Sequence, residues 1–420
     1  MRHIRSTPKS RHRQAAVFVR FVPKAEIAAS LFIGREIRIA LAAPGHHHDL
    51  LRTTLHLAAE ASLLRADVAN RDHSIVGKTQ MPKRLSSSLW GFAVLCLTVC
   101  LTPSNAAQLA ASIEYETIAR PADVPGDLQP LPGASLKFLS IKAIDGFLVH
   151  AALWQPEAKA PAETTLIVMV HGSGGNYARA PNSTLGRSLS GNGFAALAIN
   201  TRQHDDKRNT DNFLDTSRDI DAAVQSARAL GYRSIVLQGH SLGTIQVLFY
   251  AATHWEHDIK AVVQLSAFGD LPWRTRYLQI QDEDKFRALS EAALKALHEG
   301  KERDVMALRM RRTSTVEEPL TGEHFLTYRA EASSSASGPY WIKRVPHPIL
   351  MVRDAGDTII TPFEPYVLLS AATSPGSLVP SIKFIELPDP AGPNPGGHFF
   401  ADNTKLLSET IMNWIVDQHL

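Results

Sequence analysis

Gly239-His240-Ser241-Leu242-Gly243 follows an apolar, strand-like run from Ser234 to Gln238 and precedes a helix-like run from Thr244 to Thr253. This context is typical of a nucleophile elbow, in which a serine lies on a strained turn between a strand and a helix. Glycines are expected on both sides of such a serine, because a Cβ atom there would collide with the neighbouring strand or helix. Ser241 is therefore the candidate nucleophile.

Length and composition place the chain among globular proteins. Its 420 residues are 44% hydrophobic and 20% charged, which allows one large domain or two ordinary ones. Residues 1–80 hold 13 Lys and Arg against 6 Asp and Glu, whereas the residues beyond 106 are net acidic. Because the basic charge belongs to the N-terminal segment, we expect no nucleic acid among the partners.

A second pattern covers residues 81–106. Two basic residues, Lys83 and Arg84, precede an apolar run from Leu89 to Leu101, and a small residue stands at Ala106. This order is typical of a secretory signal peptide that is cleaved before the next residue. The apolar run is too short to span a bilayer, so we expect a secreted or periplasmic protein without a stable membrane span. An uncleaved membrane anchor is the alternative.

The signal-peptide pattern lies inside the chain instead of at its first residue. We therefore interpret Met81 as the true start and residues 1–80 as an upstream extension, disordered or not expressed, because they show no sustained period and no recognisable domain. The only two cysteines, Cys96 and Cys100, lie inside the apolar run. The mature chain would then have none, which excludes disulfides, cysteine nucleophiles and thiolate metal sites.

Beyond a polar linker over residues 107–133, strands and helices alternate over residues 134–420. A hairpin is predicted first, since Leu136–Ile144 and Leu148–Trp154 alternate around Asp145-Gly146. An antiparallel start followed by βα units predicts an α/β fold with a mostly parallel sheet covered by helices on both faces. Beside the elbow, the later strands are expected at Thr165–Val170, Phe194–Ile199, Ala261–Leu265, Ile349–Val352 and Ile382–Leu387, and the helices at Thr184–Leu189, Leu214–Leu230 and Thr404–Val416.

The alternation is interrupted over about residues 271–345. The sequence predicts charged, amphipathic helices there, for example over Ser290–His298, and no run of residues has the pattern of a strand. Two interpretations stay open for this insertion. It forms either a helical cap over the carboxyl edge of the sheet, where such folds bind ligands, or an ordinary decorated surface.

A serine nucleophile needs a base and a carboxylate that orients the base. His398 is the predicted base, because it follows two glycines in the loop between the last strand and the last helix. Asp357 is the predicted carboxylate, since it lies just past the end of the preceding strand. Asp354 is closer to that strand, and we expect it to make a turn contact instead.

The loop His171-Gly172-Ser173-Gly174-Gly175 follows the first strand of the parallel series. Its glycines let backbone N–H groups approach a developing oxyanion, and the expected donors are the amides of Ser173 and of Leu242, the residue after the nucleophile. A glycine-rich loop can also bind phosphate, but the chain has neither G-x-x-x-x-G-K-[ST] nor G-x-G-x-x-G here.

The chain from about Leu136 to Val416 resembles the α/β-hydrolase family. The resemblance lies in the elbow, in the glycine loop after the first parallel strand and in the chain order Ser241, Asp357, His398. The resemblance implies the α/β-hydrolase fold, with a mostly parallel eight-stranded sheet, helices on both faces and a helical cap insertion. It also implies a serine hydrolase that cleaves a small-molecule carboxylic ester through an acyl-enzyme, with Ser241, His398 and Asp357 as the triad and no metal or organic cofactor. An amidase or peptidase with the same triad is the alternative, and a non-catalytic binding protein of this fold is a further one.

A second resemblance concerns the stretch from Asn200 to Asp205. It is similar to a subgroup of the family that includes fungal siderophore-ester hydrolases, but Gln203 replaces the glycine usual in the subgroup's Asn-x-Arg-Gly-His stretch. The substrate is therefore not carried over, and we expect Arg202 and His204 to be structural. The sequence leaves the acyl and alcohol specificity and the oligomeric state open.

Overall fold

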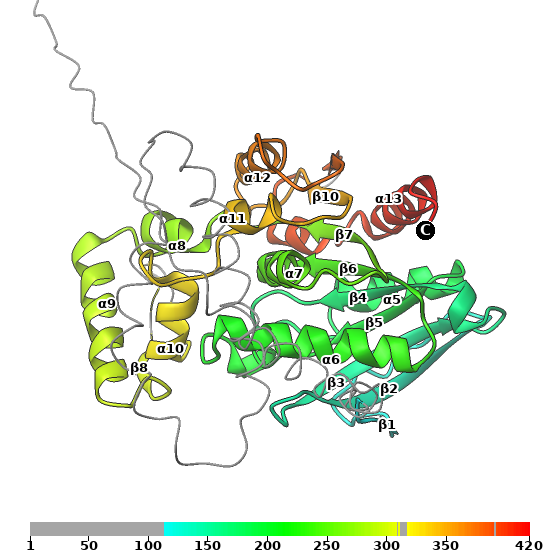
Figure 1. The fold of residues 1–420 in the computed structure, drawn as a ribbon, viewed down its shortest axis with the longest axis horizontal. Coiled ribbons are helices and arrows are strands. Elements are labelled where there is room, and N and C mark those ends of the chain that lie inside the picture. Colours follow the sequence, from blue (N-terminus) through cyan, green and yellow to red (C-terminus); the bar gives the residue numbers. More distant parts are fainter. Residues whose placement is uncertain (1–112, 309, 311–316, 390–391) are drawn as a thin grey trace, which may run out of the picture. The chain divides into compact units, whose positions relative to one another are not determined.

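The computed structural model describes residues 113–308, 310, 317–389 and 392–420. The predicted extension and signal peptide lie outside this part of the chain. The described residues form a nine-stranded sheet in the order β1-β2-β3-β5-β4-β6-β7-β10-β11 (Figure 1). Its strands are β1 (Tyr115–Ile118), β2 (Ala134–Lys142), β3 (Leu148–Pro156), β4 (Thr165–Val170), β5 (Ala195–Ile199), β6 (Ser234–His240), β7 (Ile259–Leu265), β10 (Ile349–Asp354) and β11 (Ile382–Leu387).

The sheet is antiparallel at one edge and parallel elsewhere. Strands β1, β2, β3 and β5 pair antiparallel in succession, and each pair from β5 through β4, β6, β7 and β10 to β11 is parallel. The predicted mostly parallel sheet is therefore confirmed. It has nine strands and not the expected eight, because β1 pairs with β2 from within the segment that we expected to be a linker.

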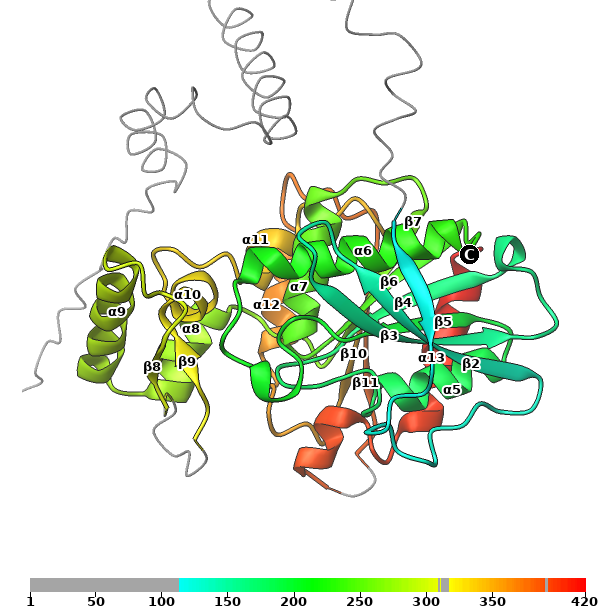
Figure 2. The same cartoon turned by 90° about the horizontal axis from the view of Figure 1, so that it is seen from below.

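Helices cover both faces of the sheet (Figures 1 and 2). Residues of α6 (Thr216–Ala229), α7 (Leu242–Thr253), α11 (Gly338–Ile342) and α12 (Glu364–Ala372) share one hydrophobic cluster with the strands. Residues of α5 (Asn182–Gly191) and α13 (Thr404–Asp417) pack in the cluster on the other face. All six residues of β4 are buried, as expected for a strand covered on both sides.

The chain leaves the sheet between β7 and β10 and forms a separate cluster of short elements beside it (Figures 1 and 2). We call this segment the cap. The sequence showed no strand there, yet β8 and β9 pair antiparallel. These strands span only three and two residues, too short for an alternating pattern to be visible. The cap elements are α8 (Leu271–Arg274), the π-helix η5 (Thr275–Ile280), α9 (Glu283–His298), β8 (Val305–Ala307), β9 (Leu320–Thr321), α10 (Gly322–His324) and the π-helix η6 (Phe325–Arg329), followed by α11.

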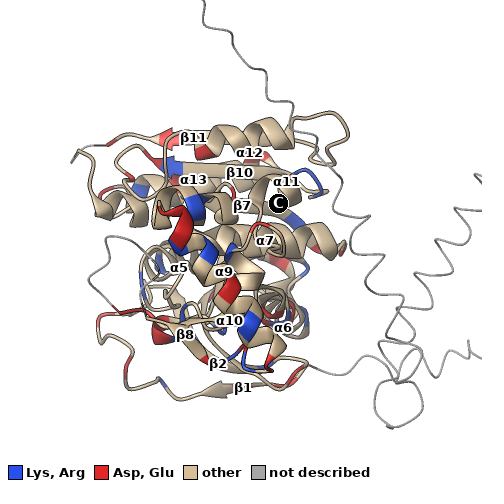
Figure 3. Cartoon of the chain, turned by 90° about the vertical axis from the view of Figure 1, so that its left-hand side faces the viewer, with Lys and Arg blue, Asp and Glu red and all other residues tan. Residues whose placement is uncertain are grey.

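Helix α9 explains why the cap is charged in sequence. It buries Phe286, Leu289 and Ala293 against the rest of the cap, and most of its basic and acidic residues, blue and red in Figure 3, are exposed. The two signs alternate along the helix, so this face carries no large field of one sign. The charge pattern is that of a solvated helix surface.

Buried polar groups attach the cap to the sheet domain. The Asp211 carboxylate, in the segment after β5, accepts a hydrogen bond of 2.6 Å from the Tyr328 hydroxyl and lies 3.2 Å from Nδ1 of His324. Gln246 on α7 donates to the same tyrosine hydroxyl over 3.1 Å. Leu242, which follows the candidate nucleophile, shares a hydrophobic cluster with Tyr328. The cap is therefore in contact with the helix that begins at the elbow.

None of the described helices is long and apolar enough to cross a membrane.

We predict that Gly243→Ala destabilises the fold. A Cβ atom at Gly243 would lie 2.6 Å from the carbonyl oxygens of Val170 and His171, which are backbone atoms that cannot turn away. Overpacking of this kind costs about 1–3 kcal/mol, although alanine is the better helix former by up to about 1 kcal/mol. Urea unfolding should therefore show a lower midpoint.

The control for this experiment is Gly126→Ala, because no atom lies within 4 Å of the Cβ that it would add. Its unfolding midpoint should match that of the wild type. Equal midpoints for the two variants would contradict the packing argument.

Candidate active site

Ser241 lies on the turn between β6 and α7. Its backbone angles, φ 54° and ψ −123°, fall where residues with a side chain are rarely found. The turn holds because Ser241 N–H donates to the Leu265 carbonyl over 2.9 Å, while Thr244 N–H donates to the Ser241 carbonyl over 3.0 Å. The predicted strand, turn and helix are all present, and Ser241 is 6% exposed.

Three glycines make room for this turn. A Cβ at Gly239 would lie 2.5 Å from the Gly243 carbonyl oxygen, and one at Gly243 would meet the end of β4. Gly172 approaches from the other side, where a Cβ would lie 2.7 Å from Cβ of Ser241. The loop after β4 is therefore packed directly against the serine side chain.

His398 and Asp357 are joined by a hydrogen bond. Nδ1 of His398 lies 3.0 Å from Oδ2 of Asp357, and both side chains are buried. Because a carboxylate can only accept, Nδ1 carries the proton and Nε2 is left with a lone pair. The other carboxylate oxygen accepts from the backbone N–H groups of Ile359 and Ile360, over 2.8 and 3.0 Å.

The pKa of Asp357 lies below its usual value. Burial opposes ionisation, but the hydrogen bond and charge of His398 and the two backbone N–H groups outweigh it. Asp354, the other acid of this loop, instead accepts from Gly356 N–H over 2.8 Å and from the Asn403 amide over 2.7 Å. The structure thus places Asp357 beside His398 and gives Asp354 a turn contact.

His240 connects the elbow to the His398 loop. Its Nε2 lies 2.8 Å from the backbone oxygen of His398, which also accepts from the Ser266 hydroxyl over 3.2 Å. The carbonyl cannot donate, so Nε2 of His240 carries the proton. Sequence reasoning named His240 only as an elbow residue, because nothing in the motif shows that its side chain turns toward a loop 158 positions away.

The ring of His398 lies beside His240, the residue that precedes Ser241. The imidazole rings of His240 and His398 are 4.9 Å apart, yet among the described residues no hydrogen bond joins Oγ of Ser241 to His398. In free enzymes such a contact is often long and shortens when substrate binds. The structure therefore places the His398–Asp357 pair beside the elbow, without the final proton-transfer contact.

His171 fixes the loop after β4. Thr201 N–H donates to its Nε2 over 3.1 Å, so the proton is on Nδ1, which lies 2.7 Å from the Gly172 carbonyl oxygen. The amides of Ser173 and Leu242 donate to no other described residue. These two backbone N–H groups thus have no partner among the described residues.

The stretch from Asn200 to Asp205 is held by internal contacts. Arg202 pairs with the buried Asp219 over 2.7 Å, and His204 lies 2.9 Å from the Asp205 carboxylate. Gln203 is fully buried, and its amide has no partner within the described part of the chain. Arg202 and His204 are thus each held by a neighbouring carboxylate.

The described residues contain no group of three or more His, Cys, Asp or Glu side chains that is placed to hold a metal ion.

Comparison with known proteins gives a family match. Residues 165–389 match the family model described as alpha/beta hydrolase fold. A search of curated proteins found no match.

A search of solved structures found similar chains at low sequence identity. Est1E from Butyrivibrio proteoclasticus, with ferulic acid bound, is 19% identical over 66% of this chain and 98% of its own, with a TM-score of 0.47. A carboxyl esterase from Bacillus coagulans, in complex with glycerol, is 16% identical over 68% and 99%, with a TM-score of 0.48. DcsB, in complex with its substrate analogue, is 16% identical over 68% and 100%, with a TM-score of 0.51.

We predict that His240→Gln weakens the pH dependence of stability. Burial, and next the neighbouring His398, lowers the pKa of His240 to about 3. The unfolded chain therefore takes up a proton below about pH 6.5 that the folded chain excludes, so stability falls as the pH falls. Removing this group should reduce the slope of the unfolding free energy by at most about 1.4 kcal/mol per pH unit.

Denaturant unfolding between pH 7 and pH 4.5 measures this slope. The control is His298→Gln, because His298 is exposed at the end of α9. A slope that changes equally in both variants would show that His240 is not held neutral by the fold.

Proposed function

This chain belongs to the α/β-hydrolase family, and we propose that it hydrolyses a carboxylic ester through an acyl-enzyme. The observation that carries the proposal is Ser241 on its strained turn, with two open backbone amides beside it and a hydrogen-bonded His398–Asp357 pair next to the elbow. These are the parts that acyl transfer to serine requires.

In the first half of the reaction, Oγ of Ser241 attacks the ester carbonyl while Nε2 of His398 accepts the hydroxyl proton. The carbonyl oxygen becomes negative and accepts hydrogen bonds from the amides of Ser173 and Leu242. The bond to the alcohol oxygen then breaks, and His398 returns the proton to that oxygen. The products are an alcohol and an acyl-Ser241 ester.

In the second half, His398 takes a proton from water, which attacks the acyl-enzyme. The tetrahedral intermediate collapses, the proton returns to Oγ of Ser241, and a carboxylic acid leaves. Asp357 keeps the proton on Nδ1 of His398 and stabilises the imidazolium that forms in each half. The backbone amides of Ile359 and Ile360 hold this carboxylate in place.

Esters are the preferred substrates over amides because an alcohol leaves more readily than an amine. A panel of short-chain esters, aromatic esters, amides and peptides separates these classes. We expect turnover of esters and at most weak turnover of amides.

We predict that Ser241→Ala lowers kcat at least about 10³-fold and that Asp357→Asn causes a loss of similar order. The alanine removes the nucleophile, and the asparagine no longer holds the required His398 tautomer. Ester hydrolysis by the purified variants measures both effects. The matched control Ser217→Ala, on α6, should retain wild-type activity, and an active Ser241→Ala would exclude the acyl-enzyme.

Secretion is the second part of the proposal, and the sequence pattern over residues 81–106 supports it. We predict that the mature protein begins near Ala107, because signal peptidase cleaves after small residues. Mass spectrometry of the protein purified from its native source measures the N-terminal peptide. A purified chain that still begins at Met1 would contradict the signal peptide.

A further inference from the structure

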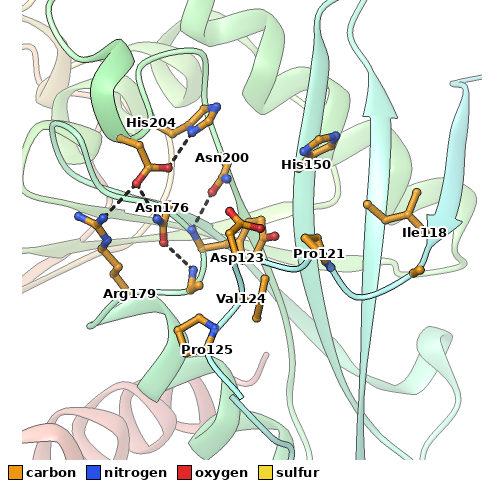
Figure 4. Close-up of a pocket in the computed structure, with 14 residues that line it drawn as sticks. Ile118, Pro121, Asp123, Val124, Pro125, His150, Asn176, Arg179, Asn200 and His204 are labelled. Carbon is orange, nitrogen blue, oxygen red and sulfur yellow. Dashed lines mark hydrogen bonds and ion pairs between the residues drawn. The ribbon is translucent and has the colours of Figure 1, made fainter. Parts of the chain in front are cut away.

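A pocket of about 760 Å³ lies beside the loop after β4 (Figure 4). We call it the side pocket. Its walls come from the β1–β2 connection, from the segments that follow β4 and β5, and from His150 on β3. Its volume is in the range of small-molecule sites. Ser241, His398 and Asp357 do not line it.

The side pocket shares a wall with the proposed oxyanion loop. Asp205 N–H donates to the Gly175 carbonyl over 3.2 Å, and the Asn176 amide donates to the Asp205 carboxylate over 2.8 Å. The same loop packs against Ser241 through Gly172. Asn176 is four positions beyond Gly172 in this loop, a span of at most about 14 Å. The side pocket and the Ser241 side chain therefore border the same loop.

Several polar groups of the side pocket are already paired. The Asp205 carboxylate receives hydrogen bonds or ion pairs from Asn176, His204 and Arg179, and Figure 4 marks these contacts. The Asn200 side-chain oxygen accepts from Tyr177 N–H over 2.7 Å. These contacts shape the pocket wall and leave little hydrogen-bonding capacity for a ligand.

Other polar groups of the side pocket have no partner in the part of the chain that the structure describes. They are the Asp123 carboxylate, the His150 imidazole and the amide N–H groups of Asn200. Figure 4 shows no dashed line at Asp123 or His150. Burial, and next the charge of Asp123, raises the pKa of Tyr177 to about 12, so its hydroxyl remains a donor. The pocket thus offers donors and an acceptor together.

This mixture selects the chemistry of a ligand. Asp123 and Asp205 outnumber Arg179, so the lining disfavours an anion such as phosphate or a carboxylate. A hydroxyl group both donates and accepts, and so matches neighbouring donors and acceptors. Apolar surface from Ile118 and Val124 lies in the same pocket and suits the C–H face of a ring. Together these properties fit a neutral, hydroxyl-rich ring.

We propose that the side pocket binds a sugar unit in the alcohol part of the ester substrate. The acyl group then lies at Ser241, and the sugar extends past the oxyanion loop to Asp123, His150 and Asn200. This inference rests on the proposed ester hydrolysis and adds the substrate class to it. It also gives the Asn200–Asp205 stretch a role in forming the pocket wall.

Two acetate esters test the proposal because they differ only in the alcohol. An acetylated disaccharide reaches the side pocket, whereas p-nitrophenyl acetate does not. For Asp123→Ala and for His150→Ala, kcat/KM on the disaccharide ester should fall about 10-fold or more, mainly through a higher KM. The same variants should hydrolyse p-nitrophenyl acetate at the wild-type rate.

The matched control is Asp127→Ala, which removes an exposed carboxylate from the same connection but outside the pocket lining. It should leave both substrates unaffected. Asp123 and His150 are exposed, so their variants should fold, and thermal unfolding checks this. If a variant unfolds, Asp123→Asn and His150→Gln repeat the test with a smaller change.

Losses that are equal for the two esters, or no loss for either, would overturn the sugar assignment. Acetylcholine is measured as a third ester, and a loss confined to it would overturn the sugar assignment and assign the side pocket to a cation. These outcomes differ from failure of the proposed function, in which the wild-type protein would hydrolyse neither acetate ester and would not react with a serine-directed phosphonate.

Discussion

Three backbone segments meet at Ser241 with no side chain between them. The end of β4, the turn after β6 and the start of α7 approach so closely that only glycine fits at positions 172, 239 and 243. This contact forces Ser241 into its positive φ, a strain of about 1–3 kcal/mol that the surrounding sheet must stabilise. As a result, the serine hydroxyl, the amide of Leu242 and the loop that carries Ser173 all lie at the carboxyl ends of β4 and β6.

The remaining parts of the site depend on this turn. His240 is directed toward the His398 loop and holds its carbonyl, so the elbow also helps to place the candidate base. His171 holds the loop after β4 through Thr201 at the end of β5. Both imidazoles are buried, and burial keeps them neutral at physiological pH, with pKa values of about 3 and about 4. Each can therefore hold a backbone group as a neutral ring, and His240 places no positive charge beside His398.

Much of this arrangement follows from sequence because it depends on local patterns. The elbow needs its glycines, β4 is a continuous apolar run, and Asp357 lies three residues beyond the end of its strand, where only a loop residue can turn toward His398. The missed elements lack such patterns. Strand β1 is held by backbone pairing at the sheet edge, and β8 and β9 are too short to show a period. The role of His240 and the side pocket depend on contacts between distant segments, which a single sequence does not reveal.

The central claim is that Ser241 is the nucleophile and that His398 activates it. Intact-protein and peptide mass spectrometry after treatment with a serine-directed phosphonate tests this claim most directly. The account predicts one adduct, located on the peptide that contains Ser241, absent in Ser241→Ala and formed much more slowly in His398→Ala. An adduct on another serine, or a wild-type protein that remains unlabelled, would contradict it.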